Sequence, residues 1–164
     1  MKKLIAIDPG PVNSGVSIIE AETYRPILAG KFDNESVMEI VADHVSESRV
    51  VIEMVGHYGT GMPAGKDVFE TCILIGRFIE IFLQAGLVVE TMPRRTAKLN
   101  LCGSMRAKDS NVRQALVDRF APGERNYGKG TKAQPGFFYG FSADAWQAYA
   151  LGITYIDMKR GKAV

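Results

Sequence analysis

The sequence is poor in the residues that build disulfide frameworks and zinc sites. It contains only two cysteines, Cys72 and Cys102, and two histidines among 164 residues. The cysteines lie about thirty residues apart, with no second cysteine or nearby histidine at zinc-ligand spacing. These scarcities argue against a disulfide-stapled fold and a structural zinc finger, and they predict two buried free thiols.

Long apolar runs and the common nucleotide motifs are also missing. No stretch approaches the ~20 residues of a membrane span, and the apolar segment after the Met-Lys-Lys start is too short for a signal peptide. No GxxxxGK[ST] loop, GxGxxG turn or nucleophile elbow is present. We therefore expect a soluble, cytoplasmic, single-domain protein that uses no membrane and no small-molecule cofactor.

The charge is distributed unevenly, although the net charge is only +2. Residues 1–93 carry 7 Lys and Arg against 13 Asp and Glu, a balance of −6, whereas residues 94–132 carry 10 against 3, a balance of +7. A basic block of this kind indicates a polyanionic partner, contacted through its phosphates. The alternative is a solvated surface whose counter-charges lie elsewhere in the fold.

One carboxylate ends a strongly apolar strand near the amino terminus. The run Leu4–Ile7 is continuous and apolar, ends on Asp8, turns through Pro-Gly and returns as the apolar Val16–Ile19. This pattern is typical of a strand buried on both faces and its hairpin partner. Asp8 then lies at the carboxyl end of a central strand, where ligands and metals often bind. Its alternative role is to cap the turn.

Two further carboxylates occupy comparable places. Glu53 lies near the end of a second apolar strand, 49–55, and Asp144 falls in the first turn of a helix predicted from Ser142 to about Arg160. An ionised group at the end of a buried strand must be paired, coordinated or exposed. The alternatives are a structural ion pair for Glu53 and a helix-end role for Asp144.

The other segments continue an alternation of strands and helices. We predict a strand at 24–32, a helix beginning at Ser36, a helix capped by Asp67 and ended by Gly86, a strand at 87–92, a helical turn at 96–101, a helix from 109 or 110 to 122, and a mobile loop at 122–140. The helix after Asp67 is apolar over more than one stripe. It is expected to pack on the sheet and either within the core or on a second subunit.

The three carboxylates favour one kind of chemistry. Convergent acids without a histidine cluster suit hard divalent cations, Mg²⁺ or Mn²⁺, better than zinc or copper. Two such ions can activate a water and stabilise the leaving oxygen of a phosphodiester, while basic residues bind the remaining phosphates. This prediction requires Asp8, Glu53 and Asp144 to gather closely enough to share the ions.

Four segments, in this order, resemble the RuvC family of Holliday junction resolvases, and most closely its small phage-encoded members: IDPG, IEMV, MPRRTAKLNLCGSMRAKDSNV and SADAWQAYALG. The likeness extends from Leu4 to Ile153, and its most specific part is the run P-x₄-K-x₄-G-x₃-AK that ends in Lys108. The resemblance implies an α/β, ribonuclease H-like fold: a five-stranded mixed sheet, its first three strands antiparallel, flanked by helices. It also implies a homodimer that cleaves branched DNA such as four-way junctions, in the host cytoplasm if the protein is phage-encoded.

The resemblance also assigns roles to residues. Asp8, Glu53 and Asp144 match the acids that hold two metal ions, with Asp8 bridging them. Lys108 matches a catalytic lysine close to the scissile phosphate, and a surface lysine is its alternative. The predicted DNA-binding residues are Arg94, Arg95, Lys98, Arg106, Lys108 and Arg113, together with His57 and Tyr58 in the glycine-rich loop.

Two positions depart from the family pattern. Phe141 replaces a further acid, and Gly56 replaces an aromatic wedge, for which His57 or Tyr58 is the candidate substitute. We therefore expect three carboxylates, with water or a backbone oxygen completing the second metal. The alternatives to a DNA resolvase are a branched-nucleic-acid-binding module with weakened catalysis and a nuclease for structured RNA. An actin-like ATPase is disfavoured because the chain has no second phosphate motif.

Overall fold

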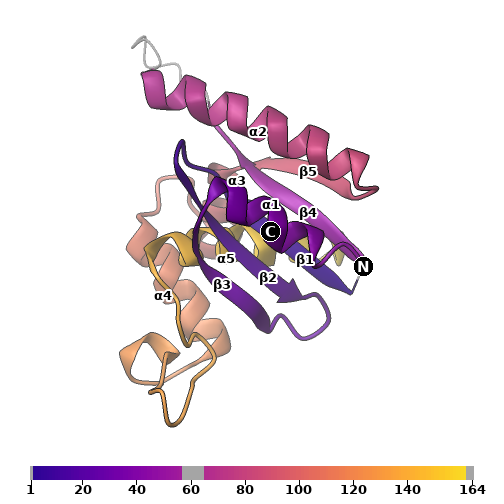
Figure 1. The fold of residues 1–164 in the computed structure, drawn as a ribbon. Helices are drawn as coiled ribbons and strands as arrows, with labels where there is room; N and C mark the ends of the chain where they lie inside the picture. Colours follow the sequence, from indigo (N-terminus) through magenta and orange to yellow (C-terminus); the bar gives the residue numbers. More distant parts are fainter. Residues whose placement is uncertain (1, 57–64, 162–164) are drawn as a thin grey trace.

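A five-stranded mixed sheet organises the computed structural model, which describes residues 2–56 and 65–161 (Figure 1). The strands are β1 Lys3–Asp8, β2 Asn13–Glu20, β3 Pro26–Asp33, β4 Ser48–Met54 and β5 Val88–Pro93; the α-helices are α1 Asn34–Ala42, α2 Lys66–Gln84, α3 Arg94–Cys102, α4 Asp109–Phe120 and α5 Ala143–Lys159. The strand order is β3-β2-β1-β4-β5. The first three strands are antiparallel, and β4 lies parallel to both β1 and β5. This confirms the predicted sheet.

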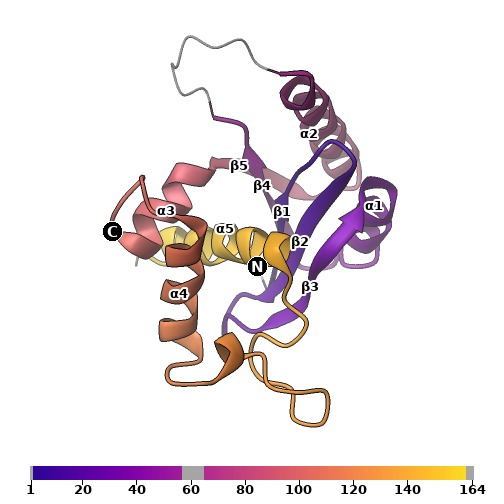
Figure 2. The same ribbon diagram turned by 90° about the vertical axis from the view of Figure 1, so that its left-hand side faces the viewer.

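Helices cover both faces of the sheet, so the central strands are buried on both sides. Alternate residues of β1 enter two separate cores: Leu4 and Ala6 pack with α5, whereas Ile5 and Ile7 pack with α1 and α2. Figure 2 shows α1 and α2 on one side of the sheet and α3, α4 and α5 on the other. The continuous apolar run at the start of the chain therefore reflects burial on two faces.

Two helices begin at other residues than predicted. The N-cap of α1 is Asp33 rather than Ser36, because the Asp33 carboxylate accepts hydrogen bonds from the backbone N–H and the hydroxyl of Ser36. Helix α2 has Gly65 as its N-cap, and Asp67 lies inside the first turn. There its charge still complements the helix dipole.

Helix α2 has apolar residues on two opposite faces. Leu74, Ile75, Phe78 and Phe82 are buried in the core, whereas Phe69 and Ile73 are 61% and 66% exposed.

Both cysteines are free, but the expectation that they are buried is wrong: Cys72 is exposed on α2, and Cys102 is half-buried at the end of α3. Within the described residues, no helix is long and apolar enough to span a membrane.

The predicted loop at 122–140 is exposed over most of its length, and it is anchored to the core through Phe137 and Phe138. It contains a 3₁₀ helix, Asn126–Gly128, and its Phe138 is fully buried. The Phe138 ring lies 4.5 Å from Trp146 and 5.1 Å from Phe141, measured between ring centroids. The glycines of this segment allow tight turns, and its aromatic residues anchor it.

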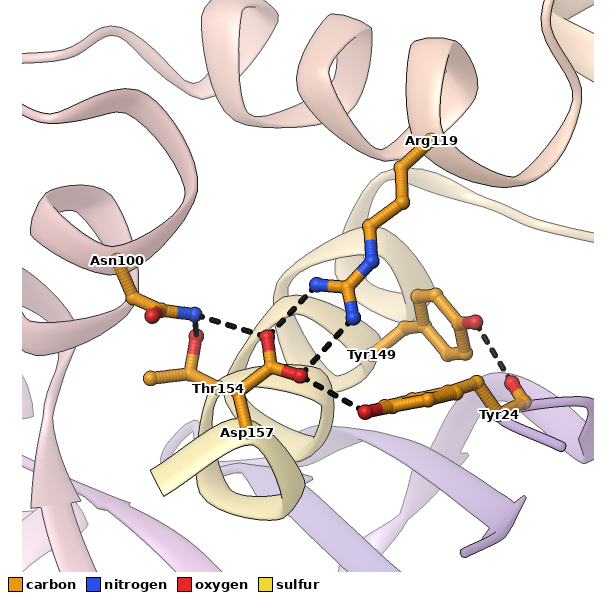
Figure 3. A network of polar contacts seen from close by, with 6 residues as sticks. All are labelled: Tyr24, Asn100, Arg119, Tyr149, Thr154 and Asp157. Carbon is orange, nitrogen blue, oxygen red and sulfur yellow. Dashed lines mark hydrogen bonds and ion pairs between the residues drawn. The ribbon is translucent and has the colours of Figure 1, made fainter. Parts of the chain in front are cut away.

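A buried polar network fastens α3 and α4 to α5 (Figure 3). The Asp157 carboxylate on α5 accepts two hydrogen bonds from Arg119 on α4, at 2.7 and 2.9 Å, and one from Asn100 on α3, at 3.2 Å. The hydroxyl of Tyr24 donates to the same carboxylate at 3.0 Å. Tyr149 donates in turn to the Tyr24 carbonyl oxygen at 2.7 Å. The network holds in place the two helices that carry half of the basic residues of 94–132.

Candidate active site

The strand register places Asp8 beside Glu53. Ile7 of β1 pairs with Ile52 of the parallel β4. The residues that follow them, Asp8 and Glu53, therefore lie side by side at the carboxyl edge of the sheet. Ala6 on β1 and Val51 on β4 both belong to the core beneath α5. Because side chains alternate along a strand, Asp8 and Glu53 lie on that same face.

Gly15 brings Asp144 to the same place. It pairs with Asp8 across the hairpin, and a Cβ atom built on Gly15 would lie only 2.5 Å from the carbonyl oxygen of Asp144. The first turn of α5 can therefore approach the sheet beside Asp8 only if this position is glycine. Sequence reasoning missed Gly15, although a lone glycine inside a predicted hairpin strand was the available signal.

Two basic side chains pair with the three acids. Arg94, the first residue of α3, lies 3.8 Å from Asp8 and 3.7 Å from Glu53, measured between nitrogen and carboxylate oxygen. Lys31 of β3 lies 3.1 Å from Asp144. Arg94 is thus a partner of the acids, its predicted contact with DNA stays a prediction, and no sequence pattern pointed to Lys31. Lys31 reaches Asp144 because it pairs with Gly15 on the neighbouring strand.

The three acids share one end of the sheet without forming a compact cage. Across residues 2–56 and 65–161, no group of three Asp, Glu, His or Cys side chains is arranged to hold a metal ion. Mg²⁺ is commonly held by only one or two carboxylates together with substrate phosphates and waters. The donor chemistry of Asp8 with Glu53, and of Asp8 with Asp144, fits such an ion, provided that Arg94 and Lys31 give way. Metal binding therefore stays a prediction.

Solved structures with the same architecture include RuvC from Thermus thermophilus, which aligns with a TM-score of 0.68 over 98% of each chain at 16% sequence identity. The structure of T. thermophilus RuvC in complex with a Holliday junction substrate aligns with the same TM-score over 98% of each chain, at 14% identity. The chain has a RuvC-like fold. No protein-family model and no curated protein sequence matches it.

This RuvC-like, ribonuclease H-type fold confirms the predicted architecture, and it places an aromatic residue where a fourth acid was considered. Phe141 is 3% exposed and packs on the rings of Phe138, Trp146 and Tyr149. The residue next to the start of α5 thus serves the core. It contributes no ligand to the site.

Burial makes ionisation of the two strand acids costly. It raises the pKa of Asp8 to about 6, although Arg94 opposes the rise. Burial and the charge of Asp8 raise the pKa of Glu53 to about 7. The site therefore favours an additional positive charge, whether from a proton or from a bound cation.

We expect Glu53→Gln to stabilise the protein at pH 8 in the absence of divalent cations. Because the pKa of Glu53 is raised by folding, its ionisation destabilises the native state as the pH rises from about 4.5 to 7, and glutamine avoids this cost. The gain should be about 1–3 kcal/mol at pH 8 and close to zero at pH 4.5. Urea unfolding at both pH values measures it, and an equal effect at both would contradict the prediction.

Part of the basic block lies close to the acids. The charge of Asp109, the first residue of α4, raises the pKa of both Asp8 and Glu53, so the start of α4 is near the site. Lys108 is the exposed N-cap of α4, and Lys98 pairs with Asp109 at 3.4 Å.

The other predicted DNA-binding residues lie in different surroundings. Arg95 and Arg106 are exposed, and Arg113 lines a pocket together with Asp144. His57 and Tyr58 lie outside the described residues.

Proposed function

We propose that the protein is a metal-dependent, structure-specific endonuclease of the phage-type RuvC family that cleaves branched DNA such as Holliday junctions in the cytoplasm. The observation that carries this proposal is the convergence of Asp8, Glu53 and Asp144 at one sheet end, beside the basic helix α3 and the N-terminus of α4, where Lys108 lies. A RuvC structure of the same fold was solved with a Holliday junction substrate, which supports this choice of substrate.

In this proposal Asp8, Glu53 and Asp144 would hold Mg²⁺ or Mn²⁺ ions, two per site. The ions would supply an activated water and stabilise the leaving oxygen of the phosphodiester. Without them, Arg94 and Lys31 balance the charge of the acids and keep them in place. Lys108, exposed at the start of α4, would neutralise the phosphate at the cleaved bond.

The direct test is a cleavage assay on end-labelled substrates of matched sequence: a four-way DNA junction, a flap, a linear duplex and a duplex RNA. We expect cuts on two strands of the junction with Mg²⁺ or Mn²⁺ and none with EDTA. Equal cutting of the linear duplex would contradict structure specificity. Preferential cutting of the RNA would favour the structured-RNA nuclease instead.

A DNA-binding module with weakened catalysis is the second candidate. It is favoured by the pairing of Arg94 and Lys31 with the acids and by the aromatic residue at position 141. Thermal melting with and without Mn²⁺ separates the two candidates. A site that binds the ion in the native state is stabilised by it, whereas a site that has lost metal binding is not.

Lys108→Ala is expected to weaken junction binding and to make it less sensitive to salt. Each phosphate contact adds roughly one unit to the slope of log K against log salt, so the variant should lose about one unit. Binding isotherms at several salt concentrations measure the slope. Arg25→Ala, at the opposite end of the sheet and also exposed, is the matched control. Identical slopes for both variants would show that Lys108 contacts no phosphate.

The second copy of a homodimer is proposed to bind the exposed face of α2. Phe69, Ile73 and Leu83 are exposed there, around Gly76, whose Cβ position has no neighbouring atom within 4 Å. A glycine inside a helix costs about 1 kcal/mol but allows two helices to approach closely. Glu80 lies on this face, with Glu70 and Arg77 beside it, so two copies related by a two-fold axis can match charges of opposite sign.

Ile73→Glu is therefore expected to produce a monomer. The substitution places a charge at the centre of the apolar face, where it would have to be desolvated in the dimer, and dimerisation should weaken at least about tenfold. Light scattering coupled to size-exclusion chromatography gives the mass. Ile27→Glu is the control, because Ile27 is 51% exposed on β3, away from α2. A monomeric wild-type protein would contradict the proposed dimer.

A further inference from the structure

A cavity of about 240 Å³ lies beside the three acids, between the first turns of α4 and α5. Its walls include Arg94, Asp109, Ser110, Arg113, Asp144 and Trp146. Asp8 and Glu53 do not line it. The cavity therefore adjoins the proposed site of cleavage and shares Arg94 and Asp144 with it.

Arg113 is the charged residue of this cavity whose charge is left unbalanced. Asp109 pairs with Lys98, Asp144 with Lys31, and Arg94 with the strand acids. Among the described residues Arg113 makes no ion pair, and its Nε atom is buried without a hydrogen-bond partner. Because Arg113 lines the cavity, an anionic ligand there can contact the other guanidinium nitrogens and balance the charge.

The surroundings hold the Arg113 guanidinium in position. Its central carbon lies 4.3 Å from the centre of the Tyr127 ring, in the 3₁₀ helix Asn126–Gly128. A guanidinium stacked on an aromatic ring loses little additional freedom when it binds a phosphate. The backbone N–H groups of the first turns of α4 and α5 add a favourable field for an anion.

We propose that this cavity binds a backbone phosphate of the DNA strand adjacent to the cleaved bond. This proposal rests on the proposed function. The scissile phosphate itself must reach Asp8 and Glu53. These two residues do not line the cavity, so the phosphate bound there is a neighbouring one. Arg113 pairs with it, and Ser110 donates a hydrogen bond at the rim. The cavity thereby fixes the register of the strand across the acids.

The test replaces single phosphates near the cleavage site of a four-way junction with uncharged methylphosphonates and measures binding in Ca²⁺. With wild-type protein, one position beside the cleaved bond should weaken binding about tenfold. Arg113→Ala should bind the unmodified junction about tenfold more weakly and show no further loss at that position, while losses elsewhere persist. This non-additivity identifies the phosphate that Arg113 contacts.

Ser110→Glu provides a second variant that does not depend on removing a packed arginine. Ser110 is exposed in the first turn of α4, where an acid favours the helix, yet its charge would repel a phosphate in the cavity. Ser110→Glu should abolish the loss of binding caused by the methylphosphonate beside the cleaved bond, whereas Arg25→Ala should retain that loss. Equal losses at every position in wild type and both variants would overturn the cavity proposal alone.

Two further outcomes are informative. One distinguishes a DNA phosphate from a free phosphate compound as the ligand of the cavity, and the other distinguishes failure of the cavity proposal from failure of the proposed function. The single tryptophan, Trp146, lines the cavity and reports on its occupation by fluorescence. An Arg113-dependent response to inorganic phosphate or thymidine monophosphate at micromolar concentration would assign the cavity to a free phosphate compound and overturn the DNA assignment. A wild-type protein that binds no junction would refute the proposed function and, with it, the assignment to DNA.

Discussion

Asp8→Asn should leave junction binding within about twofold of wild type and lower the rate of cleavage by at least about 10³-fold, or ~4 kcal/mol in activation free energy. Asparagine has nearly the same shape as aspartate but carries no charge, so it is a poor ligand for a hard divalent cation. Single-turnover cleavage rates in Mg²⁺ and binding constants in Ca²⁺ measure the two effects separately.

The Asp8 variant needs a control with the same chemical change. Asp43→Asn alters an exposed aspartate at the end of α1, away from the sheet edge that carries Asp8, and should cleave normally. Asp8→Asn should also unfold at a higher urea concentration at pH 8, because the raised pKa of Asp8 shows that its charge destabilises the fold. Cleavage at the wild-type rate by Asp8→Asn would remove Asp8 from the active site.

Much of the sheet could be predicted because burial on two faces leaves a strong local pattern. The apolar runs that become β1 and β4 each carry one acid at or near their carboxyl end, so Asp8 and Glu53 could be recognised before their positions in space were known. Asp144 followed from its place in the first turn of α5. Each of these residues is conspicuous in its own segment, which explains why local reasoning found it.

The partners of the acids could not be predicted, because they depend on the pairing between strands. Lys31 reaches Asp144 only through the registers of β1 with β2 and of β2 with β3. Arg94 stood out as a basic residue, but its position between Asp8 and Glu53 depends on where β5 ends beside β4. In segment 122–140, the glycines obscured the two phenylalanines that bind it to the core.

The acids at the sheet edge and the polar network around Asp157 make opposite contributions to stability. Burial at the strand ends opposes ionisation of Asp8 and Glu53, so their charges cost stability near neutral pH. Burial would also raise the pKa of Asp157, but hydrogen bonds from Arg119, Asn100 and Tyr24 outweigh it and hold the pKa below its ordinary value. The charge of Asp157 thus stabilises the fold, provided that its donors remain.

Removing the main donor should therefore be severe. Arg119→Met is expected to lower the free energy of unfolding by about 2–3 kcal/mol at pH 7, because the carboxylate of Asp157, whose side chain is 3% exposed, loses its ionic partner and keeps only the donors Asn100 and Tyr24. Chemical denaturation measures the loss. The double variant Arg119→Met with Asp157→Asn should recover part of it, since no buried charge then remains.

The pH dependence distinguishes this ion pair from simple packing. Because folding lowers the pKa of Asp157, the stabilisation is present above the ordinary pKa of an aspartate and is lost as the pH falls through its folded value. The difference between wild type and Arg119→Met should therefore shrink towards pH 3. A difference that stays constant from pH 7 to pH 3 would mean that Arg119 acts through its packing on Tyr24 and Phe120, whose ring centres each lie 4.9 Å from its guanidinium carbon.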